Sequence, residues 1–504
     1  MSHPISNASR RAFLRRAGVF SATGVAAPLA VNLAGIGRAA AQSASDYKAL
    51  VCIFLYGGND AYNTVLATDT ASWNHYLAVR DTIALRAPGT PPLMSAGAGS
   101  PERLGGVLAI NPARAQPGRS FALHPVMTGA RDLFEAKRLA VVANVGPLLR
   151  PTTKAQYQDD KFAKPPKLFS HNDQTSTWQA GAPEGAIAGW GGRAADLLAA
   201  SNSRPVFTSI SATGNAVWLS GNTVLQYQVS SRGAIRVGSW GNTLYGSTEA
   251  LTRMQNVMRR ARSSHWLEQD HAGVAGRSID AEASLSAALP GNDVAPYGTP
   301  GMSGGQDPLL QYDNPLSGGK STNSLAQQLQ IVARIIGARG ALGTHRQVFF
   351  VSMGGFDTHS DQGRSQADNM AKLSHGLKYF NDTLGAMGVA NGVTTFTASD
   401  FGRTFTSNGD GTDHGWGAHH FVMGGAVRGG DLYGNFPAYS QADVKGNFSS
   451  PNQIGNGTML PEVSVDQYAA TMARWFGVPD AQLPDLFPNL VNFDAGVRDL
   501  GFMA

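Results

Sequence analysis

Carboxylates and imidazoles follow predicted β-strands in this sequence, and such side chains can bind metal ions. In the segment GGFDTHSDQ, Asp357 and His359 come directly after a strand-like run that ends in two glycines. A carboxylate and an imidazole at a strand end can bind a divalent transition metal. The alternative is a polar turn in which Asp or Ser caps the next helix. The glycines favour a site, because they let the backbone pass closely under a ligand.

Two further aspartates stand at strand ends. Asp60 follows the run ALVCIFLYGGN, and Asp400 follows VTTFTAS. Either residue alone is explained by a turn whose polar side chains satisfy the backbone. In α/β sheets, however, ligands bind beyond the carboxyl ends of the strands. That rule selects Asp60, Asp357 and Asp400 as candidate metal ligands.

A histidine-rich loop follows Asp400. His414, His419 and His420 lie within seven residues, in a chain that contains 12 histidines. The glycines around them favour an adaptable loop that binds metal or phosphate. At least one of His419 and His420 is predicted to be structural, since they begin a strand and face opposite ways. His414 is therefore the predicted partner of Asp400.

A hydroxyl group and an arginine complete the candidate chemistry. The segment FSHNDQTSTWQAG contains Ser170, a nucleophile if it stands beside a metal. The alternative is a helix N-terminus that Ser170 or Asp173 caps. Arg403 suits bidentate binding of an anionic oxygen, and it suits a structural ion pair equally well.

Several other functions are excluded. Asp400 begins the letters Asp-Phe-Gly, but a kinase also needs a Gly-rich loop with its strand lysine and a His-Arg-Asp loop, which are missing. No Gly-x-Ser-x-Gly elbow between a predicted strand and a predicted helix supports a hydrolase triad. The single cysteine, Cys52, lies in an apolar run and can form no intramolecular disulfide.

The elements that must position these residues alternate between strands and helices. Strand-like runs occupy residues 49–55, 139–146, 346–353, 393–399 and 419–427, and amphipathic helical patterns lie between them. This alternation predicts an α/β fold, with a mostly parallel central sheet and helices on both faces. Residues 187–321 break the pattern, and we interpret them as an inserted cap on the sheet edge within a single domain, 42–504.

The first 41 residues are typical of a twin-arginine export signal. Arg10 and Arg11 precede an apolar stretch, and a small-residue cleavage site ends at Ala41. Pro28, Asn32 and several glycines interrupt the stretch, which argues against a permanent membrane anchor. The signal holds five of the 40 basic residues, so the mature chain has 35 against 35 acidic ones. Nothing in this balance suggests nucleic-acid binding.

The chain resembles the bacterial domain-of-unknown-function family 1501. The resemblance covers nearly all of the mature chain and rests on the export signal and on motifs in the family's order: YGGNDAYNT, ALHP, LAVVANVGP, GGFDTHSDQ, SDFGRT, GTDHGWGAHHFVMGGAVRGGDLYG and DQYAATMARWFGV. It implies remote kinship with the alkaline phosphatase and sulfatase superfamily, and therefore a three-layer α/β/α sandwich with metal ligands at strand ends.

The resemblance also implies roles for individual residues. Asp60, Asp357, His359, Asp400 and His414 match metal ligands, with His419 as a weaker match for the last of them. Ser170 matches the nucleophile, and Thr152 and Thr153 are rivals for that role. Phe401 departs from the pattern, because the superfamily carries a ligand histidine there.

These observations lead to two hypotheses about function. The first is an exported, metal-dependent hydrolase of phosphate or sulfate esters, with Ser170 and Arg403 as catalytic residues. The missing histidine favours one ion, or a carboxylate-rich pair (Mg, Mn or Ca), over two zincs. The second is a non-catalytic periplasmic binding or assembly protein that keeps the fold. Both imply the twin-arginine translocase as export partner and a periplasmic or secreted location, and the first implies an anionic small-molecule or polymeric ester as substrate.

Overall fold

The computed structural model describes residues 46–236, 243–302 and 304–504. The predicted export signal, residues 1–41, lies outside the described residues. Within the described ranges, none of the helices has both the length and the hydropathy needed to cross a bilayer.

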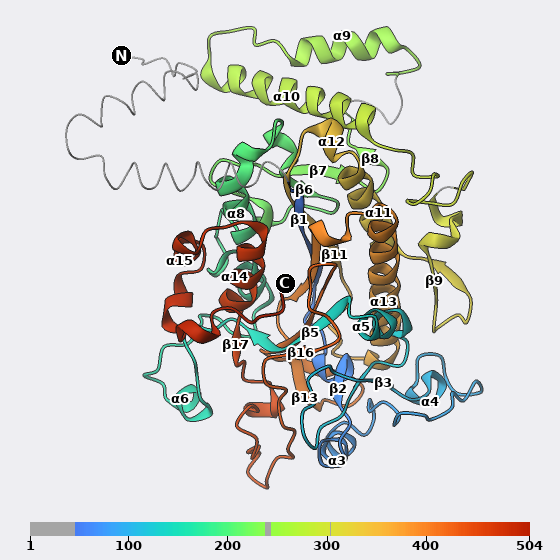
Figure 1. The fold of residues 1–504 in the computed structure, drawn as a ribbon, viewed down its shortest axis with the longest axis vertical. Coiled ribbons are helices and arrows are strands. Elements are labelled where there is room, and N and C mark those ends of the chain that lie inside the picture. Colours follow the sequence, from blue (N-terminus) through green and yellow to red (C-terminus); the bar gives the residue numbers. More distant parts are fainter. Residues whose placement is uncertain (1–45, 237–242, 303) are drawn as a thin grey trace, which may run out of the picture.

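A mostly parallel sheet forms the centre of the protein (Figure 1). Its strands follow the order β16-β5-β15-β12-β1-β11-β6-β7-β8, and β17 pairs with β5. The bounds are β1 Lys48–Leu55, β5 Leu139–Gly146, β6 Ser209–Ser211, β7 Tyr227–Ser230, β8 Gly233–Ala234, β11 Arg346–Met353, β12 Val393–Ser399, β15 Ala418–Gly424, β16 Leu432–Tyr433 and β17 Val463–Ser464. The α/β class predicted from the sequence is confirmed.

Strand β1 is the axis of this sheet, with β11 and β12 parallel to it on either side. Seven of its eight residues are buried, as expected for a strand covered on both faces. Its alternate side chains enter two separate cores: Val51 and Ile53 on one face, Cys52 and Phe54 on the other. The sheet is therefore the middle layer of three.

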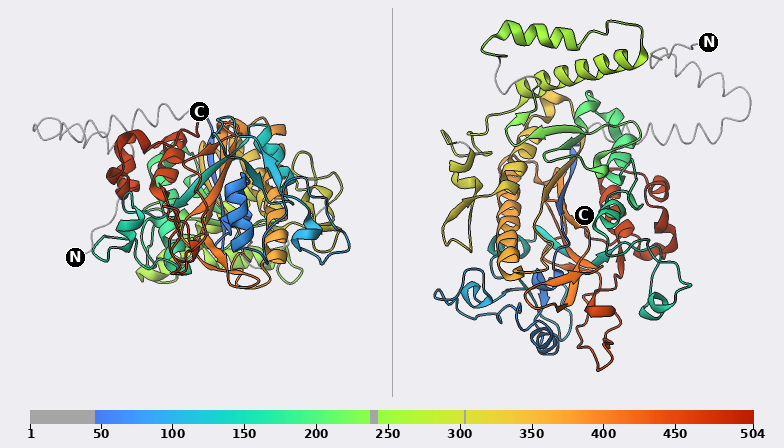
Figure 2. Two further views of the ribbon diagram at one scale, coloured as in Figure 1. Left: turned by 90° about the horizontal axis from the view of Figure 1, so that it is seen from below. Right: turned by 180° about the vertical axis from the view of Figure 1, so that it is seen from behind.

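Helices cover both faces, and the front and rear views of the ribbon show the two layers (Figures 1 and 2). One layer contains α5 (Thr128–Glu135), α11 (Ser324–Gly337) and α13 (Gln362–Ala386). The other contains α7 (His171–Ala180), α8 (Trp190–Leu198) and α14 (Val465–Phe476). This arrangement confirms the predicted sandwich.

The segment 187–321 both extends and covers the sheet. Strands β6, β7 and β8 add to its edge beyond β11. Beyond that edge lies a pair of helices, α9 (Thr248–Met258) and α10 (Trp266–Ala288), at the top of Figure 1. The edge of the central sheet is thus built from part of the predicted insertion.

Smaller elements surround the sandwich. A three-stranded sheet contains β2 Val65–Ala67, β4 Phe121–Leu123 and β3 Leu108–Ile110, and a two-stranded one contains β9 Gln311–Asp313 and β10 Lys320–Thr322. The hairpin of β13 (Arg403–Ser407) and β14 (Thr412–His414) follows β12. The remaining α-helices are α3 Thr70–Val79, α4 Pro101–Leu104, α6 Lys154–Gln158, α12 Arg339–Leu342 and α15 Leu483–Leu486.

The carboxyl ends of the central strands β1, β11 and β12 lie side by side, and the loops that follow them meet there. We call this end of the strands the carboxyl edge of the sheet. The Tyr56 amide donates to the Met353 carbonyl, and Asn59 forms a bridge with Gly402. The backbones approach closely: a Cβ on Gly57 would lie 2.3 Å from the Asp357 amide nitrogen. Since φ of Gly57 is also +115°, no other residue fits there without strain.

Candidate metal centre

Four side chains from three segments converge at this edge. His171 is the first residue of α7, Asp357 and His359 lie between β11 and α13, and His414 ends β14. Ligand atoms of His171, Asp357 and His414 lie within 4.8 Å of one another. His359 joins them, with its Nε2 3.1 Å from Asp357 Oδ1 and 3.0 Å from His414 Nε2. This is the donor set of a divalent transition-metal site.

Each imidazole has an acceptor beside its other ring nitrogen. His171 Nδ1 lies 2.7 Å from Asp400 Oδ2, and His414 Nδ1 lies 2.8 Å from the Phe169 carbonyl. His359 Nδ1 lies 3.3 Å from Asp413 Oδ1. Carbonyls and carboxylates only accept, so the Phe169 carbonyl assigns the proton of neutral His414 to Nδ1, and Asp400 holds the Nδ1 proton of His171. His359 has a carboxylate beside each ring nitrogen, Asp413 at Nδ1 and Asp357 at Nε2. The Nε2 atoms of His171 and His414 then carry lone pairs, as in metal-ligating histidines whose second nitrogen is held.

His359 Nε2 and His414 Nε2 lie 3.0 Å apart, so a proton on one of them or a shared cation lies between them. Two nitrogens that bind one ion tetrahedrally at about 2.0–2.1 Å are about 3.3–3.4 Å apart. The observed contact suits an N–H···N hydrogen bond, and a small separation of the two rings would make it suit a shared metal ion.

Electrostatics prepare Asp357 and His414 for a cation. Burial favours a higher pKa for Asp357, but the Arg403 hydrogen bond and charge outweigh it and hold the pKa below its usual range. Burial lowers the pKa of His414. At neutral pH the first is therefore an anion and the second a neutral donor. The hydrogen bond to Asp400 raises the pKa of His171, so a metal there competes with a proton.

The Phe169 carbonyl owes its direction to an unusual backbone. Phe169 has φ of 70°, a left-handed conformation that few non-glycine residues adopt. Such strain persists where the surrounding structure enforces it, and it gathers at functional sites. Here it accompanies the hydrogen bond with His414 Nδ1.

Asp400 lies behind His171. Its Oδ2 accepts from the Gly57 amide at 3.1 Å and faces His171 Nδ1, while its buried Oδ1 has no protein partner. The sequence therefore placed Asp400 at the correct edge of the sheet. In the structure, the partner of Asp400 is Nδ1 of His171. The other ring nitrogen of His171, Nε2, faces Asp357.

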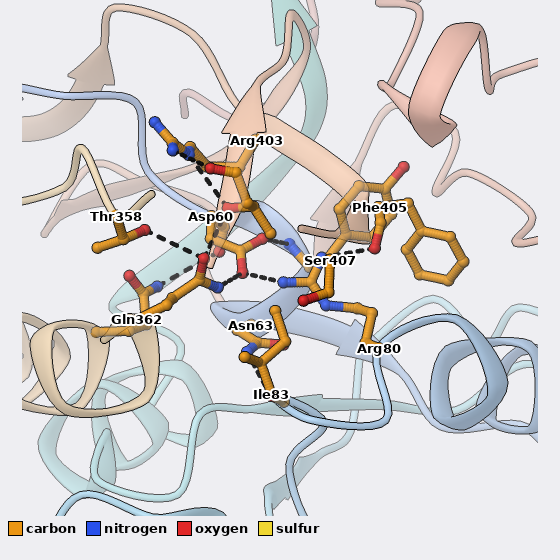
Figure 3. Close-up of polar contacts among 12 residues, drawn as sticks. Asp60, Asn63, Arg80, Ile83, Thr358, Gln362, Arg403, Phe405 and Ser407 are labelled. Atoms are coloured by element: carbon orange, nitrogen blue, oxygen red, sulfur yellow. Dashed lines mark hydrogen bonds and ion pairs between the residues drawn. The ribbon is translucent and has the colours of Figure 1, made fainter. Parts of the chain in front are cut away.

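Asp60, by contrast, is not part of the cluster of possible ligands. Figure 3 shows Asp60 among its own polar contacts, with Arg80 and Gln362 beside it. Its Oδ2 forms a fully buried ion pair with Arg80 and accepts from Gln362 Nε2, and its Oδ1 accepts from the Tyr62 amide at 3.1 Å. A carboxylate with these partners is already neutralised and hydrogen-bonded. The strand-end rule found its position but contained no information about Arg80.

Arg403 reaches the site, and its buried guanidinium faces protein acceptors. Nη1 donates to Asp357 Oδ1 at 2.8 Å and to the Gly57 carbonyl at 3.2 Å, and Nε donates to Thr412 Oγ1 at 3.2 Å. Nη2 donates to the Thr412 carbonyl. Of the two roles open from the sequence, these contacts favour the structural ion pair.

The hydroxyl candidates occupy different places. Ser170 precedes His171 and donates from Oγ to Asp173 Oδ2 at 2.8 Å. Thr153 instead caps α6 in a capping box, and Thr152 Oγ1 donates to the Arg150 carbonyl. Ser170 is therefore adjacent in sequence to a member of the site, whereas the two threonines serve their own loop.

Phe401 forms an apolar wall of the site. Its ring centroid lies 4.8 Å from that of His171 and 4.7 Å from that of His414, and the side chain is fully buried. A Cβ on Gly58 would lie 2.5 Å from the Phe401 ring, and φ of Gly58 is +85°. Glycine is thus required for this ring to pack against both imidazoles.

Two residues at this site, His171 and Asp413, were not predicted as ligands or partners. His171 follows no strand, so the strand-end rule did not select it, although it stands beside Ser170. Asp413 immediately precedes His414 in the Asp-His pair. His419, the weaker match, is buried and stacks on Phe436 with ring centroids 4.4 Å apart.

Comparisons with known proteins add family membership. A family model described as "Protein of unknown function (DUF1501)" matches residues 47–487. No curated protein matches. Ps i-CgsB, solved in complex with k-i-k-neocarrahexaose, is 8% identical, covers 89% of this chain and 77% of its own, and has a TM-score of 0.35. A Bacteroides thetaiotaomicron protein designated BT33494S-sulf, from work on glycosaminoglycan metabolism, is 9% identical. It covers 77% of this chain and 69% of its own, with a TM-score of 0.29. Likenesses this low carry no argument about function.

Proposed function

Because the chain belongs to the DUF1501 family of proteins of unknown function, its activity has to be inferred from its own site, and we propose that it is a metal-dependent hydrolase of phosphate or sulfate esters. The cluster of His171, Asp357 and His414, with His359 Nε2 beside Asp357 and His414, carries this proposal. The predicted export signal adds a periplasmic or secreted location, reached through the twin-arginine translocase.

The proposed ligands are His171, Asp357, His359 and His414. Three imidazole nitrogens and one carboxylate oxygen suit zinc better than magnesium or calcium, which prefer oxygen, and manganese accepts both. This set revises the carboxylate-rich site expected from the sequence. When bound, such an ion supplies Lewis-acid polarisation of an ester oxygen.

The surrounding residues have positioning roles in this proposal. Asp400, Asp413 and the Phe169 carbonyl each lie beside Nδ1 of one imidazole and orient the ring. Arg403 holds Asp357, and Phe401 closes the apolar side of the site. Ligands held in this way would keep a bound cation in a fixed position, where it could stabilise the negative charge that develops on an ester oxygen.

Ser170 is the proposed nucleophile, because it directly precedes His171 and already donates its hydroxyl proton to a carboxylate. That hydrogen bond lowers the pKa of Asp173. A carboxylate with a low pKa is a weak base, so Asp173 would orient the hydroxyl and would not by itself deprotonate it.

One observation favours a second candidate, an exported protein that binds metal without turning over an ester. The Arg403 guanidinium donates to Asp357, Gly57 and Thr412, and the anion clamp expected from the sequence is thereby occupied. In that case the same four ligands would hold an ion for binding or assembly.

Metal analysis and ester turnover distinguish these candidates. The exported protein should contain about one zinc or manganese ion per chain and should hydrolyse p-nitrophenyl phosphate or p-nitrophenyl sulfate, with the activity lost to a chelator and restored by the metal. Stoichiometric metal without turnover of a broad ester panel would favour the binding protein. Absence of metal, with no uptake on titration, would refute both forms of the proposal.

A further inference from the structure

A chain of buried polar contacts connects the Asp60–Arg80 ion pair to the candidate metal centre (Figure 3). At one end, Arg80 bonds to Asp60 Oδ2 and donates from Nη1 to the Thr404 and Phe405 carbonyls at 3.1 and 3.2 Å. Gln362 contacts the same Asp60 oxygen through Nε2. Asp60 is therefore held in place by Arg80, and it is the first residue in a path of hydrogen bonds that continues through Gln362.

Gln362 is the first junction, because its amide both donates and accepts. While Nε2 donates to Asp60, Oε1 accepts from Thr412 Oγ1 at 2.6 Å and from Thr358 Oγ1 at 3.2 Å. The side chain is completely buried. A glutamate here would place two carboxylates together, and a leucine would remove one hydrogen bond from each of three polar groups, so this position depends on an amide.

Thr412 is the second junction. Its hydroxyl donates to Gln362 Oε1 and accepts from Arg403 Nε at 3.2 Å, while its carbonyl accepts from Arg403 Nη2. Arg403 then reaches Asp357 Oδ1 from Nη1 at 2.8 Å. The path therefore ends on a carboxylate of the metal centre.

Exposure differs sharply along this path. The side chains of Asp60, Arg80 and Arg403 are 0% exposed, whereas that of Asp357 is 47% exposed. A half-exposed carboxylate explores several rotamers unless a rigid partner holds it, and buried hydrogen bonds in a low-dielectric interior supply that rigidity. Arg403 is the partner, and its own orientation depends on Thr412.

We propose that Gln362 and Thr412 are positioning residues, which transmit the orientation fixed by the Asp60–Arg80 ion pair to Arg403 and so hold Asp357 ready for a metal ion. The inference rests on the proposed metal centre. It gives Asp60 a role in metal binding although it is not a ligand. Residues behind the ligands alter metal affinity by about 10–100-fold in other sites.

The deciding comparison is between Thr412→Val and Thr412→Ser in the full-length exported protein. Valine keeps the shape and removes the hydroxyl, whereas serine keeps the hydroxyl. Thr395→Val is the matched control, because Thr395 is equally buried and its Oγ1 has no partner. Zinc affinity would be measured by competition with a chromophoric chelator, and geometry by the visible spectrum of the cobalt-loaded protein. Thermal midpoints of the metal-free variants would be recorded alongside.

Thr412→Val should weaken zinc binding by about 10–100-fold and change the cobalt spectrum, while Thr412→Ser and Thr395→Val resemble the wild type. Equal affinities and spectra for the valine and serine variants would overturn the positioning role and leave the metal centre intact. A wild-type protein that takes up no metal would overturn the proposed function and this inference together. If Thr412→Val does not fold, Gln362→Met is tested in its place. It should weaken zinc binding by a similar factor, and a zinc affinity and cobalt spectrum equal to those of the wild type would overturn the positioning role.

Discussion

His359 Nε2 and His414 Nε2 face each other at 3.0 Å, each on a ring whose Nδ1 lies beside an acceptor. The Phe169 carbonyl cannot donate a proton, so neutral His414 carries its proton on Nδ1, and its Nε2 is left to accept from His359 Nε2–H or to bind a cation. The two histidines come from different segments, the loop after β11 and the end of β14, and this relationship is therefore a property of the fold.

Replacing either histidine by alanine should remove most of the metal. His359→Ala and His414→Ala each delete one proposed ligand, and both side chains are partly exposed, so the metal-free variants should differ little in stability from the metal-free wild type. His271→Ala, in an exposed position of α10, is the control. Metal content after dialysis and thermal midpoints with chelator check both expectations. Full metal retention in either variant would show that the ligand set is wrong.

The Asp60–Arg80 ion pair leads to a stability prediction that needs no metal. Removing one partner of a buried pair leaves the other charge unpaired, which destabilises by about 3–5 kcal/mol. Asp60→Asn and Arg80→Met should each lower the free energy of unfolding by that amount in urea titrations with chelator present.

The double variant is the control for this pair, since it leaves no unpaired charge and should be less destabilised than the two losses added together. If Asp60→Asn instead left the metal-free protein unchanged in stability and abolished metal binding, Asp60 would be a ligand after all.

The sequence predicted the sheet better than the site. Continuous apolar runs such as β1 and β5 identify buried strands because burial on both faces leaves no polar alternation. The rule that ligands bind at the carboxyl ends of strands then selected Asp357, which lies in the cluster, and Asp400, which contacts His171 of that cluster. These features are local in the sequence.

Partners that come from distant segments were not predictable. Arg80 lies 20 residues from Asp60 at the end of α3, and it converts a predicted ligand into a buried ion pair. His171 enters the site because α7 begins there, which no local pattern indicated. Phe401 stood where the resemblance predicts a ligand, and the structure shows its ring packed against two imidazoles.

Gly58 offers a test of how tightly the apolar wall must pack. Gly58→Ala places a Cβ 2.5 Å from the Phe401 ring at a φ of +85°, so both strain and collision oppose it. We expect a loss of more than about 1 kcal/mol in stability and weaker metal binding, because Phe401 must shift against His171 and His414. Gly354→Ala, whose Cβ would meet nothing within 4 Å, is the control. Identical chelator-competition curves for the two variants would contradict this account.

Three buried histidines outside the ligand set should make the protein sensitive to acid. Burial lowers the pKa of His124, His419 and His420 to about 3, from 6.5. The unfolded chain therefore binds more protons between these values, and the free energy of unfolding must fall as the pH drops below about 6.5. Each histidine contributes a slope of about 1.4 kcal/mol per pH unit. Urea titrations with chelator from pH 7 to 5 measure the total, and His420→Gln should reduce it by one proton; a slope equal to that of the wild type would rule out a buried neutral His420.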